Sequence, residues 1–346
     1  MRASLLVLLV ACGAPAETDT WQWNLPRSFP TPVVPTDNPM TTSKVELGRT
    51  LFFDTRLSIN GTQACASCHD PARAFTDGRV TPLGATGEPG IHNAMSLVNV
   101  AYNSSNTWAH DVGRLEDQAR LPMFGTAPVE MGLAGTETDL LARLHDDYGD
   151  AFTEAFDDGL TVANITRAIA CFERTIISGD SRFDRFIAGD TTALDASEQR
   201  GLALFESDRL GCTHCHAGFN LASSFAHEGA SEVRFFNTGL YDVDGQGAYP
   251  AGDRGLIEIT SVATDMGRFR APTLRNIALT APYFHDGSAS TLDAVIDHYA
   301  QGGVHSPLQS PFITGFTLTA PERVDLIAFL GALTDDTIAT NPAFVR

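Results

Sequence analysis

Two copies of the pentad Cys-x-x-Cys-His carry the clearest chemistry in the sequence. They occupy residues 65–69 and 212–216. Two thiols separated by two residues can each form a thioether with one vinyl group of a single porphyrin, and the adjacent histidine then lies beneath the iron. One copy could belong to a zinc or redox site, but two copies in one chain indicate two covalent haems. The residues expected to hold them are Cys65, Cys68, His69, Cys212, Cys215 and His216.

A helical segment leads into each pentad. Residues 48–52 (Gly-Arg-Thr-Leu-Phe) precede the first and residues 201–205 (Gly-Leu-Ala-Leu-Phe) precede the second, so the chain repeats one unit. A few packed helices can enclose a flat macrocycle, which itself supplies much of the apolar core. We therefore expect a mostly α fold with two cytochrome c-like haem domains, long loops and few strands. The domains are placed at residues 41–188 and 189–346.

Two further helices are indicated by apolar residues at helical spacing. One runs from Leu140 to Phe156, and the other begins at a capping box of Thr319 and Glu322 and continues to Leu330. Loops that control access to a haem are expected where glycine and proline are frequent. These segments are 78–90, 242–255 and 301–316.

The N-terminus indicates export. An apolar stretch too short to span a bilayer ends in the lipobox 9–12 (Leu-Val-Ala-Cys), which predicts a signal peptide over residues 1–11 and a lipid anchor on Cys12. Signal cleavage after residues 14–16 (Ala-Pro-Ala) is the alternative. Residues 12–40 are interpreted as a tether whose tryptophans pack on the first domain. Either reading predicts a protein exported to the periplasm.

The chain is strongly acidic, with a formal net charge of −19. This charge argues against binding to nucleic acid and to an anionic membrane surface, so the predicted lipid anchor is the one expected membrane contact. It favours partners with a basic patch, although solubility alone also explains it.

An exported protein with two haems can carry electrons or catalyse a reaction. A carrier has strong axial ligands such as His or Met on both faces of each iron, whereas an enzyme leaves one face open beside an acid or base. The residues on the distal side of each haem therefore distinguish these two classes.

Several segments are similar to one known superfamily, the bacterial dihaem cytochrome c peroxidases and MauG. The segments that carry this resemblance are 47–54, 74–78, 128–132, 172–179 and 271–287. It extends from about residue 40 to the end of the chain. Within the superfamily, residues 23–26, 37–40 and 121–125 are most similar to the MbnH-like dihaem enzymes.

The resemblance implies that the N-terminal haem reacts with hydrogen peroxide. Glu130 matches the distal glutamate of the family, which moves a proton from the near to the far peroxide oxygen so that water can leave. A solvated loop residue is the alternative. Gln118 and Pro122 match distal-pocket residues of MauG. Residues 80–90 hold no histidine where many of the peroxidases carry a closing ligand, and His92 is assigned to a propionate or the surface, so this haem is expected to stay open.

The sixth ligand of the second haem is expected to be Tyr299. The resemblance places it where the peroxidases hold methionine and MauG holds tyrosine. Methionine favours ferrous iron, whereas a phenolate oxygen favours Fe(III) and Fe(IV). From the residues alone a histidine is preferred, and His298, Met266 and His285 are the alternatives to Tyr299.

The resemblance also implies an electron path and a calcium ion. Trp108 matches a tryptophan between the haems that is transiently oxidised, although a purely packing role is the alternative. Three residues match those that hold calcium between the domains, through one amide and two main-chain carbonyls. They are Asn93, Thr280 and Pro282.

These inferences lead to one functional hypothesis and two alternatives. The hypothesis is an enzyme that reacts with hydrogen peroxide, reaches a paired high-valent (bis-Fe(IV)-like) state and oxidises a residue of a partner protein by long-range electron transfer. For MbnH-like enzymes the implied substrate is a tryptophan of a small exported copper-binding protein, converted to kynurenine. The alternatives are a cytochrome c peroxidase that takes electrons from a c-type cytochrome, and a dihaem electron carrier.

Overall fold

Residues 19–345, the part of the chain that the computed structural model describes, contain ten α-helices, six short 3-10 helices and four short strands. The helices are α1 (Thr42–Phe52), α2 (Cys65–Cys68), α3 (Leu115–Phe124), α4 (Glu137–Ala155), α5 (Val162–Arg174), α6 (Arg182–Ile187), α7 (Ala196–Phe205), α8 (Ile257–Thr260), α9 (Leu292–Gln301) and α10 (Ala320–Ala332). The strands are β1 (Phe225–His227), β2 (Ala230–Glu232), β3 (Phe235–Asn237) and β4 (Arg268–Arg270). They form two antiparallel pairs, β1 with β2 and β3 with β4. The prediction of a mostly α fold with few strands is confirmed.

The predicted signal peptide, the lipobox and Cys12 lie outside the described residues. From Asp19 onward the chain lies against α1, because the Asp19 carboxylate accepts hydrogen bonds from the main-chain N–H and the Oγ of Ser43, at 3.1 and 2.6 Å. Among the described helices, none combines the length and the apolar character needed to cross a membrane.

Side chains that accept hydrogen bonds from the first helical turn fix where the main helices begin. Thr319 and Glu322 form the predicted capping box at the start of α10, and Asp195 and Glu198 form a second box at the start of α7. Thr41 caps α1. Each cap satisfies main-chain N–H groups that lack a partner within the helix, which stabilises the helix by about 1 kcal/mol.

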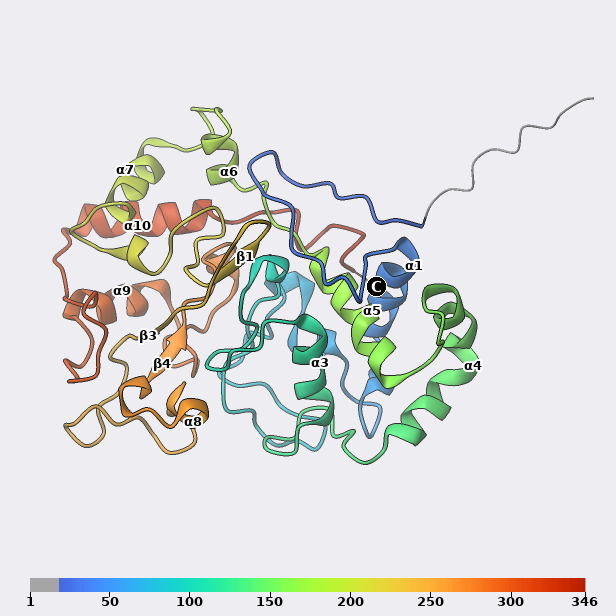
Figure 1. The fold of residues 1–346 in the computed structure, drawn as a ribbon. Coiled ribbons are helices and arrows are strands. Elements are labelled where there is room, and N and C mark those ends of the chain that lie inside the picture. The colour runs from blue at the N-terminus through green and yellow to red at the C-terminus, as the bar shows by residue number, and fades with distance from the viewer. Residues whose placement is uncertain (1–18, 346) are drawn as a thin grey trace, which may run out of the picture.

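The N-terminal half of the molecule is built on α1, α4 and α5, which lie together on the right of Figure 1. Their apolar faces form one core that includes the fully buried Phe52, Leu144 and Phe172. Burial of each such side chain stabilises the fold by roughly 1.5–3 kcal/mol. Ile338 and Phe344 also belong to this core, so the end of the chain returns to the N-terminal half.

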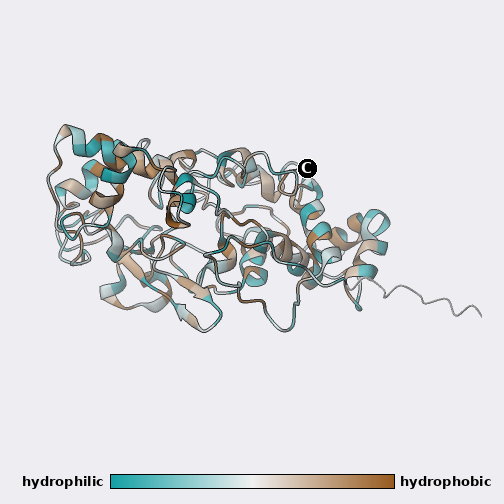
Figure 2. Cartoon of the chain, turned by 90° about the horizontal axis from the view of Figure 1, so that it is seen from above, coloured by the Kyte–Doolittle hydropathy of each residue, from teal (hydrophilic) through white to brown (hydrophobic). Residues whose placement is uncertain are grey.

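The C-terminal half is built on α7, α9 and α10, on the left of Figure 1. Its separate core includes Phe205, Ile296 and Phe329. Phe183 on α6 also belongs to this core, although it precedes the predicted domain boundary. The boundary between residues 188 and 189 therefore stays a proposal. Seen from above, the molecule is elongated, and helices at both ends carry hydrophilic beside hydrophobic residues, as Figure 2 shows.

Both halves contain one helix pair in very close contact, and a glycine permits each contact. A Cβ on Gly48 of α1 would lie 1.9 Å from the carbonyl oxygen of Ala168 on α5. A Cβ on Gly201 of α7 would lie 2.0 Å from the carbonyl oxygen of Asp325 on α10. The two glycines open the repeated segments that the sequence shows before each pentad. The repeat is therefore a repeat of packing as well as of sequence.

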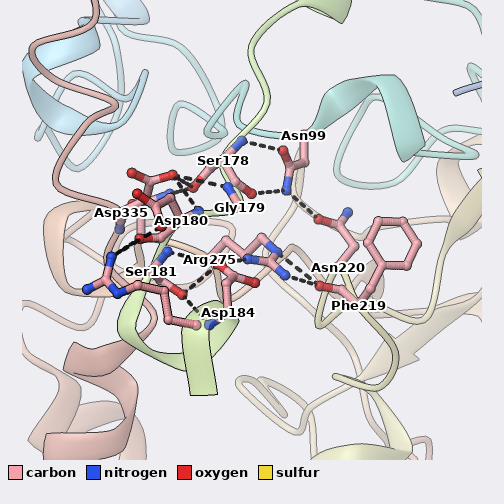
Figure 3. A network of polar contacts seen from close by, with 12 residues as sticks. Asn99, Ser178, Gly179, Asp180, Ser181, Asp184, Phe219, Asn220, Arg275 and Asp335 are labelled. Atoms are coloured by element: carbon pink, nitrogen blue, oxygen red, sulfur yellow. Dashed lines mark hydrogen bonds and ion pairs between the residues drawn. The ribbon is translucent and has the colours of Figure 1, made fainter. Parts of the chain in front are cut away.

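A polar network fixes the segment between α5 and α6 against the C-terminal half (Figure 3). Asp335 accepts hydrogen bonds from the Oγ of Ser178 at 3.2 Å and from the main-chain N–H groups of Gly179 and Asp180 at 3.0 and 3.1 Å. One buried carboxylate thus satisfies three donors of the linker, which holds the two halves in one relative position.

The same network reaches the chain that follows the second pentad (Figure 3). The buried Arg275 forms an ion pair with Asp184 at 2.8 Å and donates from Nε to the carbonyl of Phe219 at 2.9 Å. Asn99, from the N-terminal half, donates to the side-chain oxygen of Asn220 at 3.2 Å. Because Phe219 and Asn220 lie three and four residues after the second pentad, both halves contribute to holding that loop.

Residues 19–40 pack across both halves. Trp21 and Trp23 contact a small apolar cluster on the N-terminal half that includes Val45 of α1. Further along, the ring of Phe29 lies 5.9 Å from the ring of Tyr102 and 5.0 Å from the ring of Phe219, measured between centroids. These edge-to-face contacts join the segment to a residue of each half.

Candidate active site

The two pentad histidines share one geometry. Nδ1 of His69 donates a hydrogen bond to the main-chain carbonyl of Phe75 at 3.0 Å, and Nδ1 of His216 donates to the carbonyl of Leu221 at 3.1 Å. This bond fixes the tautomer and leaves Nε2 without a proton, as a metal ligand requires. Burial lowers the pKa of both histidines, which keeps the imidazole rings neutral.

The residue whose carbonyl accepts from each histidine has a left-handed backbone conformation. Phe75 has φ of 62° and Leu221 has φ of 48°, an uncommon conformation for residues other than glycine. The main-chain N–H of Phe75 donates to the carbonyl of Asp70 at 2.8 Å, and that of Leu221 donates to the carbonyl of Gly218 at 3.1 Å. These short turns hold the carbonyls in place, so the repeated unit extends beyond each pentad.

The pentad cysteines are thiols with suppressed acidity. Burial raises the pKa of Cys68 to about 12, of Cys212 to about 11 and of Cys215 to about 12, and it also raises the pKa of Cys65. Covered thiols beside a neutral, oriented histidine fit a haem held by thioethers at each pentad.

A large cavity surrounds the second pentad. Its space free of atoms is about 1840 Å³, open solvent included. Its walls carry apolar side chains together with the second pentad, and they include Cys212, Cys215, His216, Leu274, Phe316 and Tyr299. A mostly apolar cavity with one oriented histidine suits a flat macrocycle.

Tyr299 lies on α9 and faces the second pentad. Burial is the largest cause that raises the pKa of its phenol, and the nearby Cys215 and Cys212 contribute next. Both the cysteines and Tyr299 line the same cavity. Tyr299 therefore shares a cavity with the second pentad, and its role as sixth ligand of a second haem stays a prediction.

The three alternative ligands have other contacts. Nε2 of His298 is hydrogen bonded to the carbonyl of Thr238 at 3.0 Å, and Nε2 of His285 to the carboxylate of Asp253 at 3.1 Å. Met266 packs in a small apolar cluster and is not part of the cavity wall. His285 lines the same cavity as Tyr299, so the choice of Tyr299 as ligand stays a prediction.

The carboxyl group of Glu130 lies near the first pentad. Burial and the charge of Asp77 are the larger causes that raise the pKa of Cys68, and the charge of Glu130 contributes next. Burial also raises the pKa of Glu130 itself, so this half-buried carboxyl group holds a proton more readily than a solvated glutamate. Such a group can take up a proton and return it during one reaction.

Helix α3 carries Gln118 and Pro122 one turn apart, on the same face. Pro122 has no N–H, so it leaves the carbonyl of Gln118 without its usual helical partner. The carbonyl of Pro122 accepts a hydrogen bond from the N–H of Met131 at 2.8 Å. This bond ties α3 to the segment that contains Glu130.

Residues 80–90 are held against the same segment. The N–H of Ala85 donates to the carbonyl of Glu130 at 2.6 Å, and a Cβ on Gly84 would lie 2.0 Å from the carbonyl oxygen of Val129. The loop therefore lies fixed beside Glu130, and its sequence contains no histidine.

Trp108 lies between the two halves and lines the cavity of the second pentad. Its indole Nε1 donates to the carbonyl of Asn93 at 2.8 Å, and its own carbonyl accepts from the N–H of Arg270 at 2.7 Å. The indole ring lies 6.5 Å from the ring of His285, measured between centroids. Packing and hydrogen bonds from both halves thus fix its orientation.

Two histidines share one carboxylate beside Trp108. Asp253 accepts from Nε2 of His92 at 2.9 Å and from Nε2 of His285 at 3.1 Å, and the ring of Phe269 stacks on His285 with centroids 3.5 Å apart. Asp253 lies in a glycine-rich stretch whose sequence predicts only a loop. Its proximity to two distant histidines has no local signal in the sequence.

Three residues are expected to hold calcium, and this site stays a prediction. Asn93, Thr280 and Pro282 all line the cavity that contains Trp108. The side-chain Nδ2 of Asn93 donates to the carbonyl of Arg79 at 2.7 Å, which leaves its amide oxygen for another partner. An oxygen of this kind suits a hard cation.

Comparison with known proteins identifies relatives over nearly the whole chain. Residues 42–192 match the sequence profile of the di-haem cytochrome c peroxidases. The methylamine utilization protein MauG of Methylophilus methylotrophus is 35% identical over 339 residues, which cover 95% of this chain and 94% of the relative. The cytochrome c551 peroxidase of Pseudomonas aeruginosa is 34% identical over 261 residues, which cover 74% and 72%.

Solved structures show the same fold. A crystal structure of a MauG-like protein associated with microbial copper homeostasis superposes with a TM-score of 0.91 at 44% identity, and the match covers 94% of this chain and 99% of that one. The diheme peroxidase BthA from Burkholderia thailandensis superposes with a TM-score of 0.69 at 23% identity, covering 91% and 93%. The second similarity concerns the fold alone.

Proposed function

Because this chain belongs to the dihaem cytochrome c peroxidase family and is a haem-dependent oxidoreductase, we propose that it uses hydrogen peroxide to oxidise a tryptophan of a partner protein by long-range electron transfer. The partner we propose is a small exported copper-binding protein. The similarity to a MauG-like protein associated with copper homeostasis supports that choice. Family membership implies two haems, and we propose that both are attached through thioethers to the pentad cysteines.

The haems would supply the capacity to accept oxidising equivalents from peroxide, and the protein supplies proton transfer, an electron path and ligation. Glu130 carries out the proton transfer. Its carboxylate takes a proton from one peroxide oxygen and delivers it to the other, so that water becomes the leaving group. Its position near Cys68 and its burial support this role.

Trp108 provides the electron path between the halves. Its indole lines the cavity of the second pentad and donates to the carbonyl of Asn93 in the N-terminal half, while its own carbonyl accepts from Arg270 in the C-terminal half. Oxidation of this indole would divide one long electron transfer into two shorter ones. Gln118 and Pro122 shape the space above the first haem, where α3 is tied to the Glu130 segment.

The position of Tyr299 is the observation that favours oxidation of a protein substrate over simple peroxide reduction. A phenolate oxygen stabilises iron in high oxidation states, whereas a thioether ligand at this position would favour the ferrous state. Tyr299 faces Cys212 and Cys215, while His298 and His285 are hydrogen bonded elsewhere. Ligation by Tyr299 would suit a haem that stores an oxidising equivalent better than a haem that delivers electrons from a donor cytochrome.

A cytochrome c peroxidase remains the second candidate, because relatives with that name are equally similar in sequence. One experiment separates the two functions. The protein is mixed with hydrogen peroxide and either the proposed copper-binding partner or a reduced c-type cytochrome. We expect oxidised tryptophan, detected as kynurenine by mass spectrometry of the partner, and slow oxidation of the cytochrome. Fast cytochrome oxidation with an unmodified partner would establish the peroxidase instead.

Three further features complete the proposal. The enzyme is exported and anchored in the periplasm through a lipid on Cys12. A calcium ion is held by the side-chain oxygen of Asn93 and the carbonyls of Thr280 and Pro282. The formal net charge of −19 would repel nucleic acid, so we do not include nucleic acid among its partners.

A further inference from the structure

Three arginine side chains are almost completely buried in the described part of the chain, and two of them have a buried carboxylate partner. Arg174 pairs with Glu116 at 2.9 Å, and Arg275 pairs with Asp184 at 2.8 Å. The third, Arg270 on β4, is 3% exposed and has no carboxylate within ion-pair distance among residues 19–345. Burying a cation without a counter-charge costs free energy, so the surroundings of Arg270 within this range lack an anionic partner.

The hydrogen bonds of the Arg270 guanidinium are weak and incomplete. Nε lies 3.3 Å from the carbonyl oxygen of Thr107, and Nη2 lies 3.7 Å from the sulfur of Met95. Nη1 is buried and has no hydrogen-bond partner. Burial is the one resolved cause that lowers the pKa of Arg270, to about 10, which agrees with the lack of an acidic neighbour.

Arg270 lies in the wall of the cavity that surrounds the second pentad. The same wall contains Cys212, Cys215 and Tyr299. The main-chain N–H of Arg270 donates to the carbonyl of Trp108 at 2.7 Å, and its neighbour Phe269 pairs in register with Phe236 of β3. The guanidinium is therefore attached to fixed backbone and cannot leave the cavity wall without breaking these contacts.

We propose that Arg270 binds a propionate carboxylate of the second haem and thereby raises the reduction potential of that haem. A haem is the one component of the proposed holoenzyme that carries carboxylates and fits this cavity. The planar guanidinium offers donors that match a carboxylate in a bidentate arrangement. The pair removes the uncompensated charge, and the nearby cation disfavours the extra positive charge of ferric iron.

The test compares three variants of the haem-loaded protein. Arg270→Gln removes the charge but keeps a hydrogen-bond donor, and Arg270→Lys keeps the charge. Arg268→Gln is the matched control, since Arg268 lies on the same strand but is 42% exposed and pairs with Asp265 at 3.6 Å. Haem content is first checked by mass and absorbance, and each haem is then titrated by spectroelectrochemistry.

We expect Arg270→Gln to lower the ferrous-to-ferric ratio of the second haem about tenfold at a fixed potential, which corresponds to ~59 mV for a one-electron couple. Arg270→Lys should retain most of the potential, and Arg268→Gln should match the wild type. The resonance Raman band of the propionate bend should shift in both Arg270 variants. If Arg270→Gln does not incorporate haem, an unchanged propionate band in Arg270→Lys still overturns the proposal.

Other results would also contradict this assignment. A shift confined to the first haem would mean that Arg270 serves the other cofactor, and equal potentials in the wild type and Arg270→Gln would mean that it binds neither propionate. The inference rests on the proposed haem content but not on the substrate. Tryptophan oxidation in the partner can therefore persist when this proposal fails, and the reverse also holds.

Discussion

The indole N–H of Trp108 donates to the main-chain carbonyl of Asn93 at 2.8 Å, and the N–H of Asn93 in turn donates to the carbonyl of His285 at 2.7 Å. Two hydrogen bonds in series therefore connect the tryptophan to the C-terminal half. A neutral amide carbonyl accepts a hydrogen bond but is a very weak base. An electron can thus leave Trp108 while its proton stays in place.

Replacing Trp108 with Phe should interrupt electron transfer without affecting the reaction with peroxide. The first absorbance change after rapid mixing with hydrogen peroxide should keep its wild-type rate, whereas changes assigned to the second haem should slow. Trp23→Phe is the control, since Trp23 packs in the apolar cluster around Val45. Equal slowing in both variants would mean that the effect is structural and that Trp108 only packs.

Replacing Glu130 with Gln should slow the first step with peroxide by roughly 10²–10⁴-fold, the usual size of an acid or base contribution. In the wild type the step needs the carboxylate form. Because burial raises the pKa of Glu130, the rate should rise with pH through a range above that of an ordinary glutamate and then level off. Glu130→Gln should lose this rise. A rate and pH profile equal to the wild type would show that another group moves the proton.

Replacing Tyr299 with Phe should leave both haems attached and remove the sixth ligand of the second. We expect its low-spin signal in electron paramagnetic resonance to be replaced by a high-spin one. His298→Gln is the matched comparison, because His298 immediately precedes Tyr299 and is hydrogen bonded to the carbonyl of Thr238. It should retain the low-spin signal. Loss of the signal in His298→Gln alone would assign the ligand to that histidine.

The close helix pairs predict opposite effects of the same substitution at different glycines. Gly48→Ala and Gly201→Ala should each destabilise the protein by about 1–3 kcal/mol or more, since the new methyl group would overlap a carbonyl of the facing helix. Gly149→Ala on α4 and Gly331→Ala on α10 have open space around the added Cβ. They should stabilise by up to ~1 kcal/mol through helix propensity. Thermal unfolding of the four variants measures these differences, and a uniform response would contradict the packing argument.

Much of the fold follows from local sequence. Helical spacing and the capping box of Thr319 and Glu322 predict α10, and the repeated Gly-x-x-x-Phe segments predict α1 and α7. These signals are local because they depend on hydrogen bonds and side-chain spacing within one helix. The Cys-x-x-Cys-His spacing is equally local, since one porphyrin must reach all three side chains.

The contacts between distant segments could not be predicted in this way. Asp253 meets His92 and His285 across 161 and 32 positions, and Arg270 is buried although it lies between residues of ordinary strand composition. No spacing rule connects such residues, because their proximity depends on how the two halves pack. The resemblance to a family supplied Glu130 and Tyr299, which the residues alone left among several alternatives.

The aromatic contact of Phe29 has a consequence for the order of maturation. Its partner Phe219 follows the second pentad by three residues, so the early segment can reach its final position only after most of the chain has been synthesised and the second haem loop has formed. The segment at residues 19–40 is thus synthesised early but docks among the last.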